Sequence, residues 1–218
     1  MRLLSRVVDL RPGEGRLVGL LLLLAGLTGL VRVFLGASAM AIFLTQFTAA
    51  SLPYLFMASA IAMVFAGYLF EKLQARLSLA TFLGATLAAI CGITGGVRVL
   101  LLQTDAGWPA LVLASWNEVV FIVGGLAFWA LAERVLNVRQ AKRLFGFVGS
   151  GEPAAIVLGG ALLPIIVGVT GAANLLLLAA GAAALSVAVL WGIARTLPDQ
   201  LEATPEPPER DVSPGKTK

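Results

Sequence analysis

Six long apolar segments, separated by short polar or glycine-containing connections, dominate the chain. Each is close to or above the roughly 20 consecutive apolar residues that a membrane-spanning helix needs. A soluble helix is rarely apolar on every side, and six such helices in one soluble protein would be very unusual. The pattern therefore predicts an all-α integral membrane protein whose six transmembrane helices cover about 17–44, 53–70, 77–102, 109–132, 147–169 and 172–194.

Polar segments flank this transmembrane domain, which we place at residues 17–195. Residues 1–16 contain four arginines, and we expect a cytoplasmic N-terminal segment, either a short helix on the membrane surface or a solvated leader. The first apolar run is much longer than the roughly 7–15 residues of a signal-peptide core. Residues 196–218 are rich in Pro, Glu and Lys and predict a disordered cytoplasmic tail.

The basic residues outside the spans lie in only some of the connecting segments. Besides the N-terminal arginines they are Lys72, Arg76, Arg134, Arg139, Lys142, Arg143, Arg195, Arg210, Lys216 and Lys218. The connections after the first, third and fifth spans contain none. The positive-inside rule therefore predicts that both termini are cytoplasmic. This bias accounts for the net charge of +4, so we expect no nucleic-acid partner.

Composition removes several kinds of chemistry. The chain has no histidine and one cysteine, Cys91, so it lacks the residues for histidine-based catalysis, most zinc sites and an intrachain disulfide. The sequence also contains no recognisable nucleophile–base pair or metal-ligand cluster. We therefore expect neither an enzyme nor a bound metal or cofactor.

The stretch "NVRQAKRLFGFVGSGEPAAIVLGG" at residues 137–160 joins basic residues to glycines. A Walker-type phosphate loop would need lysine followed by Ser or Thr, where this chain has Glu152 and Pro153. We expect instead a basic cytoplasmic loop that contacts anionic lipid headgroups, with Glu152 near the end of span five capping that helix or pairing with the loop. The small residues that follow are spaced by four and predict a ridge for close helix packing: Gly151, Ala155 and Gly159.

Two ionisable residues are expected near the middle of the bilayer, Arg32 in span one and Glu118 in span four. Such residues are costly in lipid unless they face a partner or water. One hypothesis is a central site for a small charged solute, formed by Arg32, Trp116, Asn117 and Glu118. The other is an Arg32–Glu118 pair that only stabilises the bundle. Both residues occupy the first helix of a three-helix half, as expected for a 3+3 inverted repeat.

Several motifs resemble the bacterial ATP/ADP translocase-like family, a nucleotide-transporter family of the major facilitator type. They are "DLRPGEGR" before span one, "SLPYLF" at the start of span two, and "FWALAERVLNVRQAKRLFGFVGSGEPAAIVLGG" across spans four and five. In addition, "GYLFEKLQAR" is similar to the facilitator loop between spans two and three, with Glu71, Lys72 and Arg76 at its charged positions and Gln74 in place of the usual glycine. The resemblance implies the N-terminal six-helix half of a twelve-span fold in a bacterial inner (plasma) membrane.

The resemblance has a departure that affects function. In nucleotide exchangers of the family, the arginine matching Arg32 is closely followed by acidic and often lysine residues, whereas here Val33, Phe34, Leu35 and Gly36 follow. Two hypotheses remain. The first is a transporter-like protein that moves a charged solute as a homodimer or with a second six-helix subunit. The second is a non-transporting membrane anchor or regulatory module that acts through its cytoplasmic loop and tail. Membrane lipids are expected partners in either case.

Overall fold

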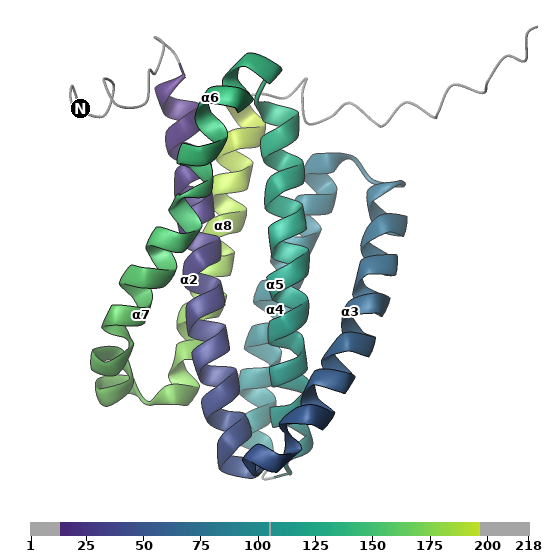
Figure 1. The fold of residues 1–218 in the computed structure, drawn as a ribbon, viewed down its shortest axis with the longest axis vertical. Helices are drawn as coiled ribbons and strands as arrows, with labels where there is room; N and C mark the ends of the chain where they lie inside the picture. The colour runs from purple at the N-terminus through teal and green to yellow at the C-terminus, as the bar shows by residue number, and fades with distance from the viewer. Residues whose placement is uncertain (1–13, 105, 197–218) are drawn as a thin grey trace, which may run out of the picture.

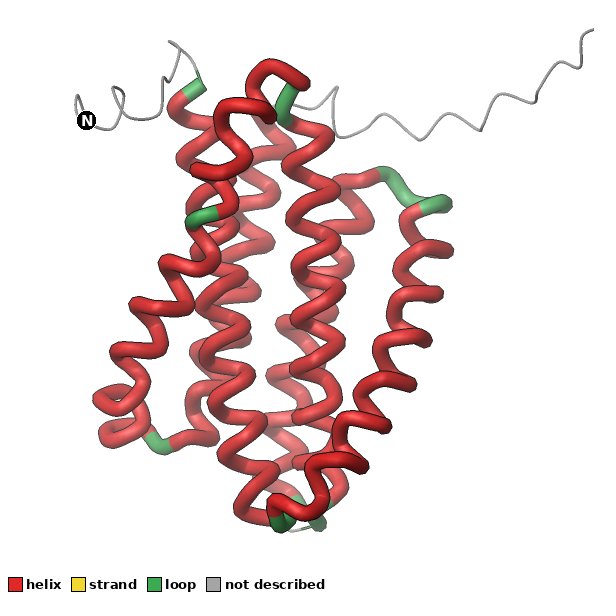
Figure 2. The backbone as a smooth tube through the Cα atoms, viewed as in Figure 1, coloured by secondary structure: helices red, strands yellow, loops and turns green. Residues whose placement is uncertain are grey.

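The structure, a computed structural model, describes residues 14–104 and 106–196; the expected N-terminal surface segment, up to residue 13, and the tail from residue 197 lie outside the described residues. Within these ranges the regular elements are all helical, which confirms the all-α class (Figure 2). The elements are α2 (Gly15–Gln46), η1 (Ala49–Ser51), α3 (Leu52–Gln74), α4 (Leu79–Gln103), α5 (Trp108–Val135), α6 (Val138–Gly149), α7 (Gly151–Thr170), η2 (Ala172–Asn174) and α8 (Leu175–Thr196).

Six helical segments of the described chain are long and apolar enough to cross a membrane. They coincide with the six apolar segments of the sequence, as expected for a multi-pass membrane protein. The helices extend beyond the predicted ends. In particular, α3 continues to Gln74, so Glu71 and Lys72 lie in its last turns and only Arg76 lies in the turn before α4.

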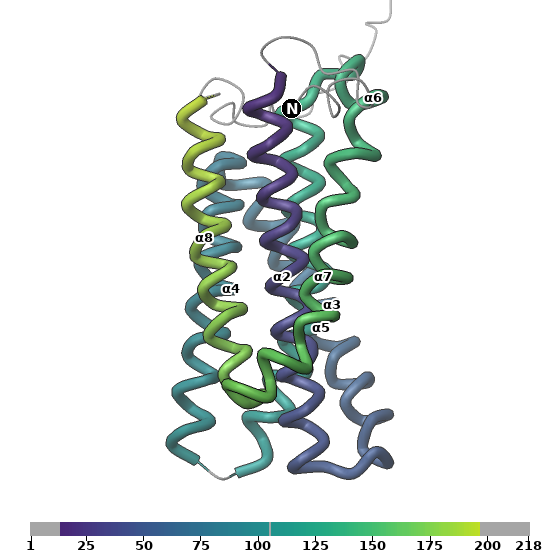
Figure 3. The backbone as a smooth tube through the Cα atoms, turned by 90° about the vertical axis from the view of Figure 1, so that its left-hand side faces the viewer, coloured from purple at the N-terminus to yellow at the C-terminus, as the bar shows by residue number. Residues whose placement is uncertain are grey.

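The helices form two layers (Figures 1 and 3). In Figure 1, α7, α2, α5 and α3 lie side by side from left to right, and α8 and α4 lie behind them. Helix α2 packs against α5, α7 and α8, while α4 packs against α5 and α8. Helices α3 and α7 are peripheral: their main contacts are with α5 and α2, respectively. We call the side formed by α7, α2, α5 and α3 the front face.

The buried core follows α2. Near the α6 end it contains Leu21 and Phe128, and farther along it contains Leu35, Leu113 and Leu176. Two spans begin with a proline in the first helical turn, where the missing N–H has no intrahelical partner to lose. The fifth span ends at Gly171, whose φ of 80° is a conformation that glycine adopts easily.

The fifth membrane-crossing element consists of two helices, α6 and α7, separated by Ser150. Pro153 explains the break, because it has no N–H to donate to the carbonyl four residues earlier. The basic connection predicted between the fourth and fifth spans is therefore mostly helical and not a loop. Arg139, Lys142 and Arg143 lie on α6, which begins with a capping box between Asn137 and Gln140. Trp129 of α5 packs edge-on against Phe145 of α6, with 5.6 Å between ring centroids.

Candidate functional site

Arg32 is the centre of a group of charged and aromatic side chains between α2, α5 and α7. Its Nη1 donates a hydrogen bond to Oε1 of Glu152, and the two residues form an ion pair between α2 and α7. The guanidinium carbon of Arg32 lies 3.6 Å from the ring centroid of Phe121 on α5, a cation–π contact. The side chains of Arg32 and Glu152 remain 23% and 17% exposed, so this charged group is only partly covered by the six helices.

The predicted Arg32–Glu118 ion pair is wrong, because the direct partner of Arg32 is Glu152. Glu118 lies one helical turn before Phe121 on α5 and accepts a hydrogen bond of 3.1 Å from the side-chain amide of the adjacent Asn117. It attracts Arg32 electrostatically without forming a direct ion pair. The sequence left open a pairing of Glu152 with the basic residues that lie on α6. In the structure Glu152 pairs with Arg32 instead.

Small residues bring α7 close enough to α2 for this contact. A Cβ atom added to Gly29 would lie 2.6 Å from the backbone oxygen of Glu152 and 3.0 Å from Cβ of Ala155. A Cβ added to Gly159 would lie 2.8 Å from Cγ1 of Val33. The structure therefore places Gly151, Ala155 and Gly159 against α2, where backbones approach closely because side chains are small.

Trp116 does not join the group around Arg32, and Asn117 is connected to it only through its hydrogen bond to Glu118. The indole Nε1 of Trp116 donates a 3.2 Å hydrogen bond to Oγ1 of Thr94 on α4. Asn117 instead lies against α2 at Gly36, where its Oδ1 would be 3.3 Å from an added Cβ. Of the four residues predicted for a solute site, Arg32, Glu118 and Asn117 lie near one another between α2 and α5, whereas Trp116 is bonded to α4.

The space beside Arg32 is small. The cavity that Arg32, Glu152, Thr28, Gly124 and Gly125 help to line has a volume of about 20 Å³. This is enough for one water molecule, whereas small-molecule sites usually measure about 300–1,000 Å³. In this arrangement the cavity beside the ion pair is therefore too small for a solute larger than water.

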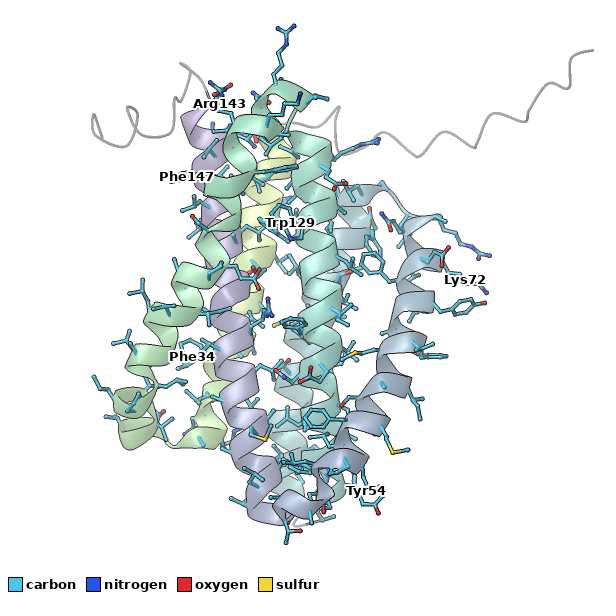
Figure 4. The ribbon with its side chains drawn as sticks, in the orientation of Figure 1. Phe34, Tyr54, Lys72, Trp129, Arg143 and Phe147 are labelled. Atoms are coloured by element: carbon cyan, nitrogen blue, oxygen red, sulfur yellow. The ribbon has the colours of Figure 1, made fainter. Side chains whose placement is uncertain are left out.

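A second polar cluster joins the start of α2 to α6. Arg143 donates to both carboxylate oxygens of Glu14, at 3.0 and 2.8 Å, and Gln140 donates to the same carboxylate at 3.1 Å. Figure 4 shows Arg143 at the end of the bundle near the start of α2. Arg143 thus binds a protein carboxylate, while Arg139 and Lys142 are exposed. We call these three residues, Glu14, Gln140 and Arg143, the α2–α6 clasp.

The sequence-based predictions missed Glu152, Phe121 and Glu14 as partners. Gly29 was the available clue that Arg32 faces α7. Gly29 lies three residues before Arg32, and Ala25 lies four residues before Gly29. That spacing matches the ridge on α7 and indicates which face of α2 the ridge packs on. Nothing comparable in the sequence identifies Glu14 as the partner of Arg143.

Comparison with known proteins finds no family model that matches the chain, no similar curated protein and no similar solved structure. The resemblance to ATP/ADP translocase-like proteins therefore rests on the sequence motifs alone.

Proposed function

We propose that the chain is one six-helix unit of a membrane transporter, and that a second unit, in the first instance another copy of this chain, covers its front face. The observation that carries this proposal is the charged group of Arg32, Glu152 and Glu118 partway along the membrane-spanning helices. A charge at the bilayer centre costs about 2.5–3.5 kcal/mol on insertion scales, so such residues usually face a partner or a water-filled cavity. Partial exposure of Arg32 and Glu152 is consistent with that role.

We further propose that the unit is a 3+3 inverted repeat of the major facilitator type, with α2–α4 matching α5–α8. The helix contacts support this. If α2, α3 and α4 are exchanged with α5, α7 and α8, the α2–α7 contact becomes the α5–α3 contact, and the α2–α8 contact becomes the α5–α4 contact. All four contacts are present in the described bundle, and the α2–α5 and α4–α8 contacts map onto themselves. In repeat transporters, substrate sites lie near the midplane between the repeats.

The charged group suggests a class of solute. One arginine and two glutamates leave a net charge of −1 when all three are ionised, which favours a cationic solute or a coupling cation over a nucleotide. In this proposal the Arg32–Glu152 pair describes a closed arrangement. Movement of one three-helix repeat against the other within a unit would separate α7 from α2 and exchange the ion pair for contacts with the solute. We place both termini in the cytoplasm and the protein in the inner membrane.

A second candidate function is a non-transporting membrane anchor or regulatory module. The water-sized cavity at Arg32 favours this alternative, because a structural ion pair needs no larger space. The α2–α6 clasp is also consistent with a rigid end of the bundle that presents the basic residues of α6 to a partner.

Oligomeric state distinguishes these functions. We would measure the mass of the protein in mild detergent by native mass spectrometry and its uptake of labelled cations in reconstituted vesicles. A transporter unit should give a dimer, and Glu118→Gln should abolish uptake while the dimer persists. A strict monomer without uptake contradicts the transport proposal and leaves the anchor or regulatory module.

A further inference from the structure

An apolar cleft of about 350 Å³ lies between α3, α4 and α5. Its walls come from all three helices, including Phe70 and Leu73 of α3, Phe82 and Ala89 of α4, and Val123 of α5. Figure 1 shows how α3 meets α5 at one end and diverges from it toward the end of the bundle that carries α6. The cleft belongs to membrane-spanning helices and has no charged residue in its wall, although Ile90 and Val120 also line the small cavity beside Arg32.

The few polar side chains in the wall are already hydrogen-bonded within the protein. Thr86 donates to the backbone oxygen of Phe82 at 2.9 Å, and Trp116 donates to Thr94 at 3.2 Å. The surface facing the cleft is otherwise apolar, so water or a polar solute would find few partners there. An alkyl chain is the chemistry that fits this lining.

The cleft is too small to enclose a whole transmembrane helix. A helix about 10 Å across and 30 Å long occupies roughly 2,400 Å³, several times the volume available. The cleft is instead within the range of small-ligand sites, about 300–1,000 Å³. A narrow, flexible chain can enter it from the bilayer.

Basic residues lie at the wide end of the cleft. Arg76 is in the turn between α3 and α4, next to Leu77 of the cleft wall. Arg134 is in the last turn of α5, eleven residues beyond Val123 and therefore on the same side of the helix as that wall residue. Both arginines are exposed. Anionic lipid headgroups are attracted to basic residues at this depth, whereas zwitterionic headgroups are attracted much less.

We propose that this cleft is a binding site for an anionic phospholipid, with one acyl chain between α3, α4 and α5 and the headgroup phosphate near Arg76 and Arg134. This inference does not depend on transport. It explains how α3 can diverge from α4 and α5 without leaving an empty space inside the bundle.

The test uses the full chain in mild detergent, with palmitoyl-oleoyl phosphatidylglycerol and phosphatidylcholine of the same chains as competing probes. Native mass spectrometry counts the bound lipid. We expect one phosphatidylglycerol per chain in preference to phosphatidylcholine. Glycerol phosphate, which has the headgroup charge without chains, should not compete. Equal retention of the two lipids, or competition by glycerol phosphate alone, contradicts the proposal.

Variants locate the site. Ala89→Trp fills the cleft and should abolish specific binding, whereas Ala88→Trp, at an exposed neighbour that does not line the cleft, should preserve it. Ala85→Phe fills the cleft from one turn earlier on α4. It replaces Ala89→Trp in the test if that variant shows no cooperative thermal transition and is therefore not folded. If both filling variants retain phosphatidylglycerol, the proposal is contradicted. It is also contradicted if these variants disrupt a dimer of the protein while the bound lipid stays.

Headgroup recognition is tested by removing charge. Arg76→Gln and Arg134→Gln should each weaken phosphatidylglycerol binding about fivefold, the effect expected of one basic residue near anionic lipid. Lys72→Gln is the matched control, because Lys72 lies over the ring of Tyr68, at 4.5 Å, and points away from the bundle in Figure 4. It should leave the affinity unchanged. A larger effect at Lys72 than at the two arginines would place the headgroup elsewhere and contradict the proposed site.

Discussion

Arg32 connects three helices through one side chain. It pairs with Glu152 of α7 and lies over Phe121 of α5, while its own backbone belongs to α2. Removing one member of a buried pair leaves the other charge without its partner, which costs more than removing both. The interaction can therefore be measured as a coupling between two substitutions.

We predict that Arg32→Gln and Glu152→Gln are each destabilising and that the double variant is more stable than the sum of the two effects implies. The coupling should be about 0.5–3 kcal/mol, the range for residues in one network, and partial exposure places it below that of a fully buried pair. Thermal unfolding in mild detergent supplies the values. The same cycle with Arg32→Gln and Glu118→Gln should give a smaller coupling energy. The opposite order would mean that Glu118 is the principal partner.

Gly29 determines how closely α7 approaches α2. We predict that Gly29→Ala lowers the midpoint of thermal unfolding, because the added Cβ would lie 2.6 Å from a backbone oxygen that cannot move without shifting the helix. Gly26→Ala is the matched control on the same helix. Nothing lies within 4 Å of a Cβ at that position, and alanine favours a helix over glycine. Equal effects of the two substitutions would show that the α2–α7 contact is looser than described.

At the level of elements, α6 depends on its first turn. Asn137 accepts a 2.9 Å hydrogen bond from the backbone N–H of Gln140, whose side chain accepts one of 3.1 Å from the N–H of Asn137. Gln140 also contributes to the α2–α6 clasp. Loss of the cap should therefore loosen both the helix start and its contact with α2.

We predict that Asn137→Ala reduces the stability of α6 by about 0.5–2 kcal/mol, the usual cost of removing such a cap. Hydrogen exchange should show faster exchange of the α6 backbone amides and unchanged exchange in α4. Ser78→Ala, at the N-cap of α4, should speed exchange in α4 and leave exchange in α6 unchanged. Uniform faster exchange in both helices after Asn137→Ala would indicate a global effect instead of a local cap.

The elements also show where sequence analysis succeeded and failed. Apolar length predicted the six spans because lipid imposes that length on any helix that crosses it. The helical nature of residues 138–146 was missed because basic residues and a glycine resemble a loop, while the capping box at Asn137 was the contrary signal. The partner of Arg32 was missed because hydropathy says nothing about the rotation of one helix against another. Contacts between small residues set that rotation here.

For the whole molecule, the distribution of basic residues predicts the orientation in the membrane. We predict that single cysteines at Ala49 and Ala106, in a Cys91→Ser background, react with an impermeant thiol reagent added outside intact cells. Single cysteines at Gln74 and Lys142 should react only after the cells are opened. These positions lie at opposite ends of the bundle, since α3 and α4 each run between them. External labelling at Lys142 would overturn the cytoplasmic placement of α6.

If a second copy covers the front face, as proposed, symmetry determines how the two copies meet. A two-fold axis along the membrane normal, placed between α2 and α5, would bring the same surface of both copies together. The edges of the front face would then meet crosswise, α3 of one copy beside α7 of the other. Both edge helices have apolar side chains available for this contact, including Ile61 of α3, which is 73% exposed, and Ile165 of α7, which is 66% exposed.

Cysteine cross-linking between two copies in the membrane tests the transport proposal most directly. One tagged copy would contain Ile61→Cys and the other Ile165→Cys, with Cys91→Ser in both, and Val99→Cys with Leu185→Cys would report on the back layer of α4 and α8. We predict an oxidised product joining the two tags for the α3–α7 pair and none for the α4–α8 pair. Absence of the α3–α7 product, or cross-linking through α4 and α8 instead, would contradict a second copy on the front face.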